Sequence, residues 1–442
     1  MNKPAAVALE DFWAVLPLHS YIYTPTGEPW PAASVNARLP PVDTGKRDDE
    51  GRPIKIKASL WLDQHRAVEQ MTWAPGRPTL IRDQLIREGG FYDWRGVKCL
   101  NLYRKPTVEL GDPKKAARWL DRGRKVFGDH ADHIVKWLAQ RVQRPGDKIN
   151  HALLLGGRQG IGKDSFLEPV KHAVGPWNFS EVSPKHMLGR FNGYLKSVIL
   201  RVSEARDLGD FDRFAFYDHI KAYTAAPPDV LRVDEKNLRE YAVPNCVGVI
   251  VTTNHKTDGI HLPADDRRHF VAWSDLSKDD FREDYWTKLW AYYRDGGHSH
   301  VASYLETLDI SAFDAKAPPP KTQAFWEIVD ASRAPEDAEM ADAIDHLRSP
   351  AALTLMQIIA HADHGFAEWL RDRKNRRQIP HRLEACGYVA VRSDSKDGHW
   401  VVHGKRQVIY ARADLSIRDR IAAANALAGQ DYSGTVIQFP KD

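Results

Sequence analysis

The sequence predicts an α/β protein with a parallel sheet at its centre, an α+β region before it and a smaller domain after it. Three short apolar runs, HALLLGG, KSVILRVSE and CVGVIVTTN, each end in small or polar residues. The segments between them are long enough to hold helices, a pattern typical of buried parallel strands joined by crossovers. At 442 residues the chain exceeds what one hydrophobic core usually supports, so we expect two or three domains.

The regions around this core follow from local patterns. Residues 1–110 mix proline, glycine and aromatic residues with short β-prone pieces and lack a helical period, which favours an irregular α+β region. Residues 111–148 carry Ile134, Leu138 and Val142 at helical spacing, so we expect a helical hairpin, or collar. The sheet domain should then occupy residues 149–315, because three consecutive prolines within APPPKTQAFWE indicate a boundary.

The C-terminal part is expected to be a winged-helix-like, DNA-binding domain over residues 325–425, followed by a tail over residues 426–442. Helical segments are followed there by two β-prone runs, YVAVRS and HWVVHGKRQVIYAR. The basic segment RDRKNRR precedes the expected recognition helix, as a phosphate-contacting element would. A solvated charged surface is the alternative. The candidate DNA-contacting residues are Arg371, Arg373, Lys374, Arg376 and Arg377.

Composition excludes several classes of protein. No apolar run approaches the roughly 20 residues that a membrane span needs, and the N-terminus lacks an apolar signal-peptide core. The three cysteines, Cys99, Cys246 and Cys386, are far apart and odd in number, so neither a disulfide framework nor a zinc site is predicted. We therefore expect a cytoplasmic protein. The net charge of +4 is too small to indicate a nucleic-acid partner without local clustering.

The segment LLLGGRQGIGKDSF nearly matches a phosphate-binding loop. Gly157, Gly160 and Gly162 let the backbone turn its N–H groups inward, and Lys163 supplies a charge for the β and γ phosphates of ATP. The usual pattern, G-x-x-x-x-G-K-[ST], ends in a hydroxyl that binds Mg²⁺. Asp164 stands at that position here, and Ser165 follows it. The alternative is a glycine-rich turn that opens a helix.

The second apolar run departs from the usual pattern in a complementary way. It ends in Glu204, but Ser203 occupies the place where an aspartate normally stands. We hypothesise an exchange of Mg²⁺ ligands, in which Asp164 holds the ion and Ser203 acts through water. Glu204 would polarise the attacking water. An ordinary carboxylate at the end of a strand is the alternative for Glu204.

Two further segments carry candidate catalytic residues. Asn254 ends the third apolar run, where it would orient water or contact the γ phosphate; a turn-forming role is the alternative. Arg267 and Arg268 precede another apolar run. In a ring of subunits such an arginine stabilises transition-state charge at the neighbour's phosphate. A salt bridge to Asp265 or Asp266 is the alternative.

Taken in order, GGRQGIGKDSF, VILRVSEARD, VLRVDEKNLREY, VIVTTNH and LPADDRRHFVAW resemble the motifs of superfamily 3 helicases of phages and other mobile elements. The resemblance is greatest to phage primase-helicase proteins of the poxvirus-like branch. It covers roughly residues 110–300 and extends into SYIYTPTGEPWPAASVNARLP near the start of the chain. The primase domain of that family is not evident, so we expect the helicase part alone, with priming by a separate primase or polymerase.

The resemblance implies a hexameric AAA+ ring that hydrolyses ATP with Mg²⁺ and moves along single-stranded and forked DNA. It assigns phosphate binding to Lys163 and the loop Gly157–Gly162, and activation of the attacking water to Glu204. Asn254 would sense the γ phosphate. Arg267 or Arg268 would be the arginine finger that one subunit supplies to the ATP site of its neighbour. VLRVDEKNLREY fits a β-hairpin, and the family's pore lysine corresponds to Lys236, with Arg232 and Arg239 in the same groove. A solvated hairpin tip is the alternative.

These features predict an ATP-dependent DNA helicase in the replication of a phage or integrated element, in the cytoplasm of a bacterial host. The alternative is a DNA-binding replication initiator or loader that ATP switches without sustained unwinding. The two off-pattern positions, Asp164 and Ser203, keep that alternative open. The two functions differ in turnover, because a motor must hydrolyse ATP faster when single-stranded DNA is present.

Overall fold

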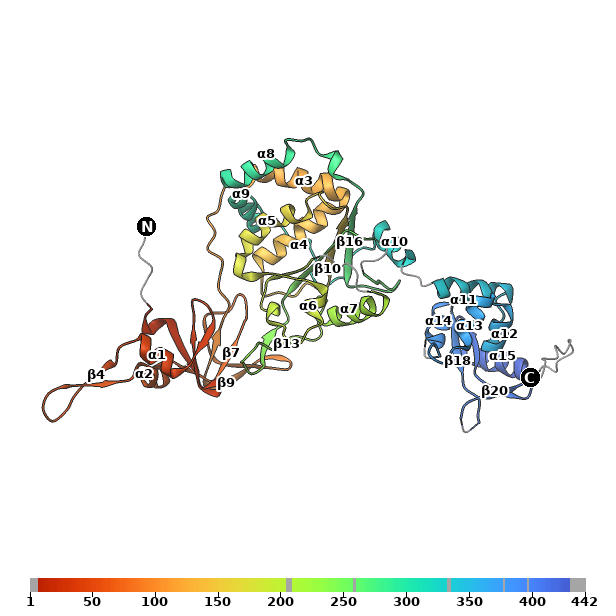
Figure 1. Ribbon diagram of the computed structural model, residues 1–442, viewed down its shortest axis with the longest axis horizontal. Helices are drawn as coiled ribbons and strands as arrows, with labels where there is room; N and C mark the ends of the chain where they lie inside the picture. The colour runs from red at the N-terminus through yellow and green to blue at the C-terminus, as the bar shows by residue number, and fades with distance from the viewer. Residues whose placement is uncertain are drawn as a thin grey trace. The chain divides into compact units, whose positions relative to one another are not determined.

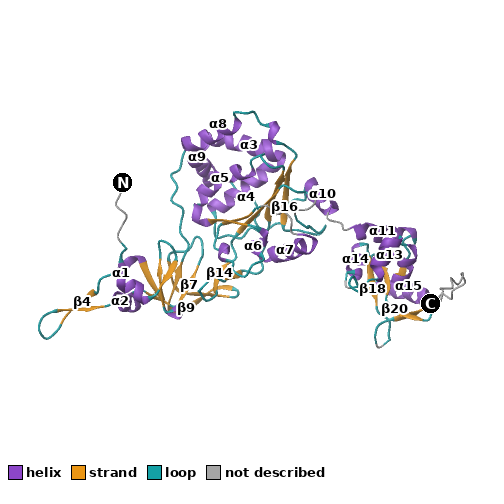
Figure 2. Ribbon diagram, viewed as in Figure 1, coloured by secondary structure: helices purple, strands orange, loops and turns teal. Residues whose placement is uncertain are grey.

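The computed structural model describes residues 7–203, 209–256, 260–331, 335–376, 378–395 and 397–429. The chain forms two compact units, residues 1–331 and 332–442, which are described separately. Figure 1 shows the elements coloured along the chain, and Figure 2 shows them by type. The first unit has a mixed α/β fold built on a five-stranded parallel sheet.

The N-terminal region combines small sheets with two helices. One sheet has the order β3-β2-β1-β6, a second pairs β4 with β5, and a third has the order β7-β9-β8. Phe12, Tyr21, Val35 and Leu62 form a small buried cluster between the first sheet and the helices. The elements are β1 (Phe12–Val15), β2 (Ser20–Tyr23), β3 (Glu28–Trp30), α1 (Ala32–Arg38), β4 (Val42–Arg47), β5 (Pro53–Ile56), α2 (Ala58–His65), β6 (Ala67–Val68), β7 (Gln70–Thr72), β8 (Leu80–Arg87) and β9 (Gly90–Asn101).

The parallel sheet has the strand order β11-β12-β15-β10-β16. The strand β10 is buried along its whole length, as a continuous apolar run in a parallel sheet should be. Helices cover both faces, with α4 and α5 on one side and α7 on the other (Figure 2). The strands are β10 (Ala152–Gly157), β11 (Phe179–Val182), β12 (Ile199–Val202), β15 (Gly248–Thr253) and β16 (His269–Ser274).

The helices around the sheet include the predicted hairpin of two helices before β10. Trp119 and Trp137 anchor that pair in the main core, where both are fully buried. The helices are α3 (Ala117–Phe127), α4 (Ala131–Gln143), α5 (Lys163–Val174), α6 (Pro184–Met187), α7 (Gly209–Thr224), α8 (Tyr285–Tyr292), α9 (His298–Thr307) and α10 (Gln323–Ala331).

The predicted β-hairpin is present between β12 and β15. Its strands β13 (Val230–Val233) and β14 (Tyr241–Pro244) are antiparallel, and Leu231 faces Val243 across the pair. The hydroxyl of Thr72 at the end of β7 donates a 2.8 Å hydrogen bond to the carbonyl of Ala242. The hairpin strand β14 is therefore attached to the N-terminal region.

The first unit continues beyond the three prolines. Helix α10 packs into the main core through Phe325 and Ile328, and the hydroxyl of Thr322 donates to the carbonyl of Val271 in β16. Residues 325–331, which the sequence pattern assigned to the C-terminal domain, therefore pack with the parallel-sheet unit. The burial of the apolar side chains of α10 therefore places the domain boundary after this helix and not at the three prolines before it.

The second unit contains a helical cluster and a small sheet. β18 pairs with β21, and β19 pairs with β20. The two β-prone runs therefore supply β18 and β21 to a three-stranded sheet with β17, in the order β17-β21-β18, and form a separate hairpin, β19-β20. The elements are α11 (Pro335–His346), β17 (Ala352–Thr354), α12 (Leu355–His361), α13 (His364–Arg371), α14 (Ile379–Ala385), β18 (Tyr388–Val391), β19 (Trp400–Val402), β20 (Lys405–Gln407), β21 (Ile409–Arg412) and α15 (Ile417–Ala428).

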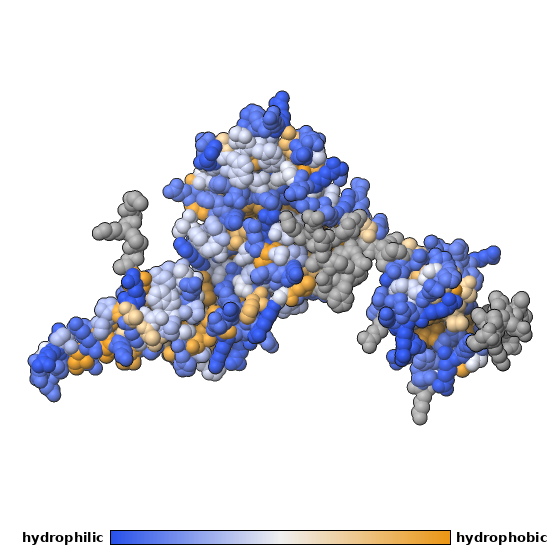
Figure 3. All heavy atoms as spheres, in the orientation of Figure 1, coloured by the Kyte–Doolittle hydropathy of each residue, from blue (hydrophilic) through white to orange (hydrophobic). Residues whose placement is uncertain are grey.

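Hydrophilic residues cover most of the face shown in Figure 3 on each unit. Within the described ranges, no helix combines the length and apolar character that crossing a bilayer requires. Of the predicted tail, residues 430–442 lie outside the described part of the chain.

Candidate functional site

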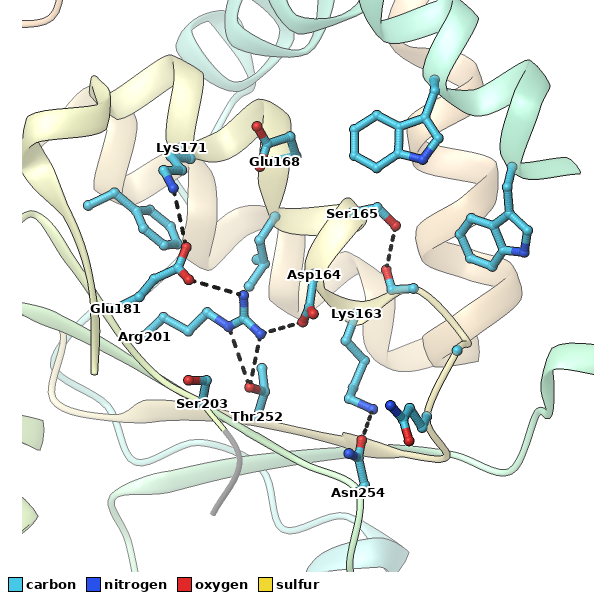
Figure 4. Close-up of a pocket in the computed structure, with 17 residues that line it drawn as sticks. Lys163, Asp164, Ser165, Glu168, Lys171, Glu181, Arg201, Ser203, Thr252 and Asn254 are labelled. Carbon is cyan, nitrogen blue, oxygen red and sulfur yellow. Dashed lines mark hydrogen bonds and ion pairs between the residues drawn. The ribbon is translucent and has the colours of Figure 1, made fainter. Parts of the chain in front are cut away.

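A cavity of about 780 Å³ lies at the carboxyl ends of the parallel strands (Figure 4). The loop after β10 and the residues after β12 and β15 meet there, because parallel strands end at one edge of a sheet. Segments far apart in the sequence thus contribute to a single site. The sequence-predicted residues that line it are Gly160, Gly162, Lys163, Asp164, Ser165, Ser203 and Asn254.

The loop between β10 and α5 requires glycine for steric reasons. Gly157, Gly160 and Gly162 have φ values of 141°, 86° and 83°, in the region that L-residues with side chains rarely adopt. A Cβ at Gly162 would lie 1.9 Å from Nη2 of Arg122, and one at Gly157 would lie 2.7 Å from the carbonyl oxygen of Ser274. The loop therefore turns tightly into the N-terminus of α5, where unpaired backbone N–H groups favour an anion.

Lys163 is a buried cation that lines the cavity. Its ammonium donates hydrogen bonds to the carbonyl oxygen of Gly157 at 2.6 Å and to Oδ1 of Asn254 at 2.7 Å. Burial lowers the pKa of Lys163 to about 8, with Asp164 opposing the shift and Arg201 adding to it. Lys163 begins α5 after the loop that follows β10, and Asn254 follows β15, the strand beside β10, so two predicted residues meet directly.

Asp164 contacts a residue that the sequence analysis did not single out. Its carboxylate forms an ion pair with Nη2 of Arg201 on β12. Nε of Arg201 lies 3.4 Å from the hydroxyl of Thr252, and Nη1 lies 3.8 Å from Oε2 of Glu181. The Arg201 side chain is 10% exposed, whereas that of Asp164 is 72% exposed. The carboxylate that replaces the usual hydroxyl therefore faces a buried guanidinium.

The sequence did contain a signal for Arg201. It stands within VILRV, an otherwise apolar run predicted to be a buried strand. A buried charge needs a partner, since desolvation costs several kcal/mol when the charge is left uncompensated. The carboxylate at the unusual Asp164 position is that partner.

The hydroxyl of Ser165 is hydrogen-bonded within the chain. It accepts from Nη2 of Arg122 at 2.7 Å and donates to the carbonyl of Gly162 at 3.1 Å. Burial lowers the pKa of Arg122, whose guanidinium lies 5.0 Å from the ring of Trp286. The contact of Ser165 with a nucleotide stays a prediction. Trp286 and Trp290 also line the cavity, although their sequence pattern did not distinguish them from core residues.

The cavity suits Mg²⁺ bound together with phosphates. Asp164 and Ser203 both line it and offer hard oxygen atoms. Within the described ranges, no group of three or more His, Cys, Asp or Glu residues could hold a metal ion. Mg²⁺ at phosphate sites usually needs only one or two protein carboxylates, so the donor set fits. The predicted catalytic Glu204 lies outside the described residues.

Arg267 and Arg268 lie away from this cavity. They precede β16, which runs parallel to β10, so they lie at the opposite edge of the sheet. Arg267 is exposed, and Nη1 of Arg268 donates to the carbonyl of Lys221 at 3.0 Å. The carboxylate of Asp266, which was considered as a salt-bridge partner, contacts His269 at 3.1 Å and accepts from the backbone N–H of Arg268 at 2.9 Å. Burial alone would raise the pKa of Asp266, but hydrogen bonding and charge from His269 lower it.

Three acidic residues of the hairpin contact cations, and one of these contacts joins Glu240 to Arg232 at 4.0 Å. Asp234 forms an ion pair with Arg190 at 3.1 Å, and Glu235 forms one with Lys196 at 2.8 Å. These last two acidic side chains are thus held against the body of the unit. The predicted DNA-contacting residues Arg232, Lys236 and Arg239 are exposed.

The basic segment of the second unit is also on the surface. Arg371 ends α13, and the turn after it carries Arg373, Lys374 and Arg376, all exposed. Arg377 lies outside the described residues. This segment leads into α14, the helix expected for recognition. Its contact with DNA stays a prediction.

Comparisons with known proteins agree with the fold. Residues 154–268 match a family described as "Family of unknown function (DUF5906)". No curated protein matches the chain. The apo structure of the NrS-1 C-terminal region is similar, with 14% identity, a TM-score of 0.59, and coverage of 91% of this chain and 95% of that one. An A form apo structure of the same region has a TM-score of 0.54 at 14% identity, covering 91% and 96%. At this identity the likeness concerns the fold alone.

Proposed function

We propose that the protein is an ATP-dependent DNA helicase of the superfamily 3 type, with a P-loop AAA+ core, used in phage or mobile-element replication. The observation that carries the proposal is the position of Lys163. Its ammonium contacts Asn254 and the carbonyl of Gly157 in a cavity beside a glycine loop at the start of a helix. These acceptors are ones that a phosphate would replace, and the loop N–H groups favour the same anion.

The residues of the cavity divide the work of phosphoryl transfer. The loop from Gly157 to Gly162 and Lys163 hold the β and γ phosphates, and Asn254 orients the attacking water. Glu204 polarises that water. Mg²⁺ bound with the triphosphate would neutralise charge on its oxygens, with Asp164 and Ser203 as protein ligands.

The exposed basic residues serve the DNA in this proposal. In a hexameric ring, Arg267 or Arg268 reaches the nucleotide of a neighbouring subunit, since both lie far from their own cavity. Lys236 on the hairpin contacts single-stranded DNA phosphates, with Arg232 and Arg239 beside it. The second unit acts as a winged-helix-like domain on forked DNA, in the cytoplasm of a bacterial host. A separate primase or polymerase supplies primers.

Magnesium-dependent ATP hydrolysis with and without single-stranded DNA tests the proposal. We expect DNA to stimulate the native protein, and Lys163→Ala and Glu204→Gln each to abolish hydrolysis. Lys185→Ala, which removes an exposed lysine outside the cavity, is the matched control and should retain the native rate. ATP hydrolysis that single-stranded DNA does not stimulate, or that Lys163→Ala does not reduce, would reject the motor.

One observation favours the second candidate, an ATP-switched initiator or loader. Asp164 is paired with Arg201, so its carboxylate is already engaged when a metal arrives. Tight ATP binding with negligible turnover in the native protein would support that function. Asp164→Ala addresses the metal role itself, because unchanged turnover and unchanged Mg²⁺ dependence would exclude Asp164 as a ligand.

A further inference from the structure

A second cavity, of about 610 Å³, lies between the N-terminal region and the parallel-sheet domain. Its walls come from the β2–β3 turn, the end of β9 with the segment after it, and the residues just before β11. The turn contributes Thr24, Pro25, Thr26 and Gly27. The motif YTPTG near the start of the chain, which the nucleotide cavity does not use, therefore has a place at this one.

The cavity contains a cation stacked on an aromatic ring. The guanidinium carbon of Arg104 lies 4.2 Å from the centre of the Trp177 ring, which is 40% exposed. Trp177 Nε1 and Asn178 Nδ2 both donate to the carbonyl oxygen of Arg104, at 2.8 Å and 2.9 Å. These two bonds hold the Arg104 backbone, so the stacked pair is preorganised in the free protein. Nucleobases stack on both indole rings and guanidinium planes.

The remaining lining is polar and positively charged. Lys105 and Lys196 join Arg104, and none of the described lining residues is acidic. Asn178 is fully buried, and its Oδ1 accepts no hydrogen bond among the described residues. The combination of flat stacking groups, cations and an unused acceptor suits a base attached to a phosphate.

This cavity is also connected to the hairpin. Lys196 lines it and forms a 2.8 Å ion pair with Glu235 at the hairpin tip. Glu235 in turn accepts a 2.6 Å hydrogen bond from the hydroxyl of Tyr241 on β14. A phosphate bound at Lys196 would compete with Glu235 for the ammonium, so occupancy of the cavity and the hairpin tip share one charged contact.

We propose that this cavity binds one nucleotide unit of single-stranded DNA, with the base stacked against Arg104 and Trp177 and the phosphate beside Lys105 and Lys196. The site is separate from the ATP cavity and from the hairpin lysine. The inference rests on the proposed function only in taking DNA as the nucleic acid. It adds a contact that grips bases as well as phosphates.

Fluorescence anisotropy of a labelled oligothymidylate, measured without ATP, tests this site. Trp177→Ala and Arg104→Ala should each weaken binding about tenfold, as loss of a stacked base does. Trp177→Phe should restore most of the affinity, which separates stacking from a folding defect. Arg104→Lys should remain weak, because it keeps the charge and loses the plane. Trp94→Ala and Arg95→Ala, exposed residues on β9 outside the cavity, are the controls and should bind as the native protein does.

Two further probes define the ligand. An abasic strand of the same length should bind the native protein more weakly and should be insensitive to Trp177→Ala. Thymidine monophosphate should not displace the strand; displacement would assign the cavity to free nucleotides and overturn the proposal for a strand. Native affinity in both alanine variants would also overturn it. This binding assay does not measure ATP hydrolysis, so its outcome is independent of the proposed motor. If the native protein shows no ATPase activity but Trp177→Ala still weakens DNA binding, the motor is rejected and this site is retained.

Discussion

The cations of the nucleotide cavity and those of the hairpin tip differ in what holds them in place. Lys163 and Arg201 are both buried, and each contacts acceptors from neighbouring elements. Lys236 and Arg239 at the hairpin tip are exposed. Desolvation makes an unpaired buried charge costly, so buried cations have defined partners, whereas exposed ones are placed by the backbone alone. Substitutions in the cavity should therefore remove nearly all of the activity, whereas substitutions at the hairpin tip should reduce DNA binding in part.

Replacing the buried lysine should have the largest effect. Lys163→Ala removes the charge beside the expected phosphates, and we expect ATP hydrolysis to fall at least about 100-fold. Steady-state phosphate release measures this. Lys185→Ala should remain at the native rate, and equal losses in both variants would remove the distinction between buried and exposed lysines.

The pH dependence of ATP binding sharpens the same distinction. Burial lowers the pKa of Lys163 to about 8, and only its protonated form attracts phosphate. Apparent ATP affinity should therefore be highest below about pH 8 and fall about tenfold for each pH unit above it. The decline should end where the pH reaches the pKa that Lys163 has in the ATP complex. Lys163→Arg keeps its charge, so any binding it retains should not decline in this range. A flat native profile from pH 7 to 10 would contradict a lowered pKa.

The ion pair of Asp164 with Arg201 should appear as an energetic coupling. Asp164→Ala and Arg201→Ala should each lower the free energy of unfolding. The double variant should lose about 1 kcal/mol less than the sum, because the pair is then removed together. Urea denaturation of the four proteins measures this double-mutant cycle. Strict additivity would mean that the contact carries no net interaction.

Removing an exposed hairpin cation should have a smaller effect that depends on salt. Lys236→Ala should weaken binding of single-stranded DNA a few-fold and reduce the slope of log affinity against log salt by about 1. Basal ATPase activity should not change. Lys46→Ala, on an exposed strand of the N-terminal region, is the matched control. An unchanged slope in Lys236→Ala would place the lysine outside the DNA path.

The smallest change is expected in the second unit. Arg373→Ala with Lys374→Ala should lower affinity for forked DNA and leave binding to a short single strand unchanged, since this segment belongs to a separate compact unit. Electrophoretic mobility shifts with the two DNAs compare them directly. Equal losses on both substrates would assign the segment to general electrostatic attraction.

Local patterns predicted much of the parallel-sheet unit. The apolar runs became β10, β12 and β15, and the helical spacing of Ile134 and Leu138 became α4. The glycine loop and Lys163 were recognisable because a tight turn and a phosphate contact each demand particular residue types. The role of Arg122 could not be predicted in this way, since its partners, Gly162 and Ser165, lie about forty positions further along the chain.

By itself the sequence determined the glycine turn, the buried strands and the exchange of residue types at Asp164 and Ser203, because these depend on short-range sterics and on hydrophobic burial. Only the tertiary structure decided that β15 lies between β10 and β12, which brings Asn254 to Lys163 and Thr252 to Arg201. It also decided that residues 24–27 and Trp177 line a second cavity together. Such contacts depend on the order of the strands and on how the elements pack together. Their free energy depends on the desolvation of groups that are distant in the sequence.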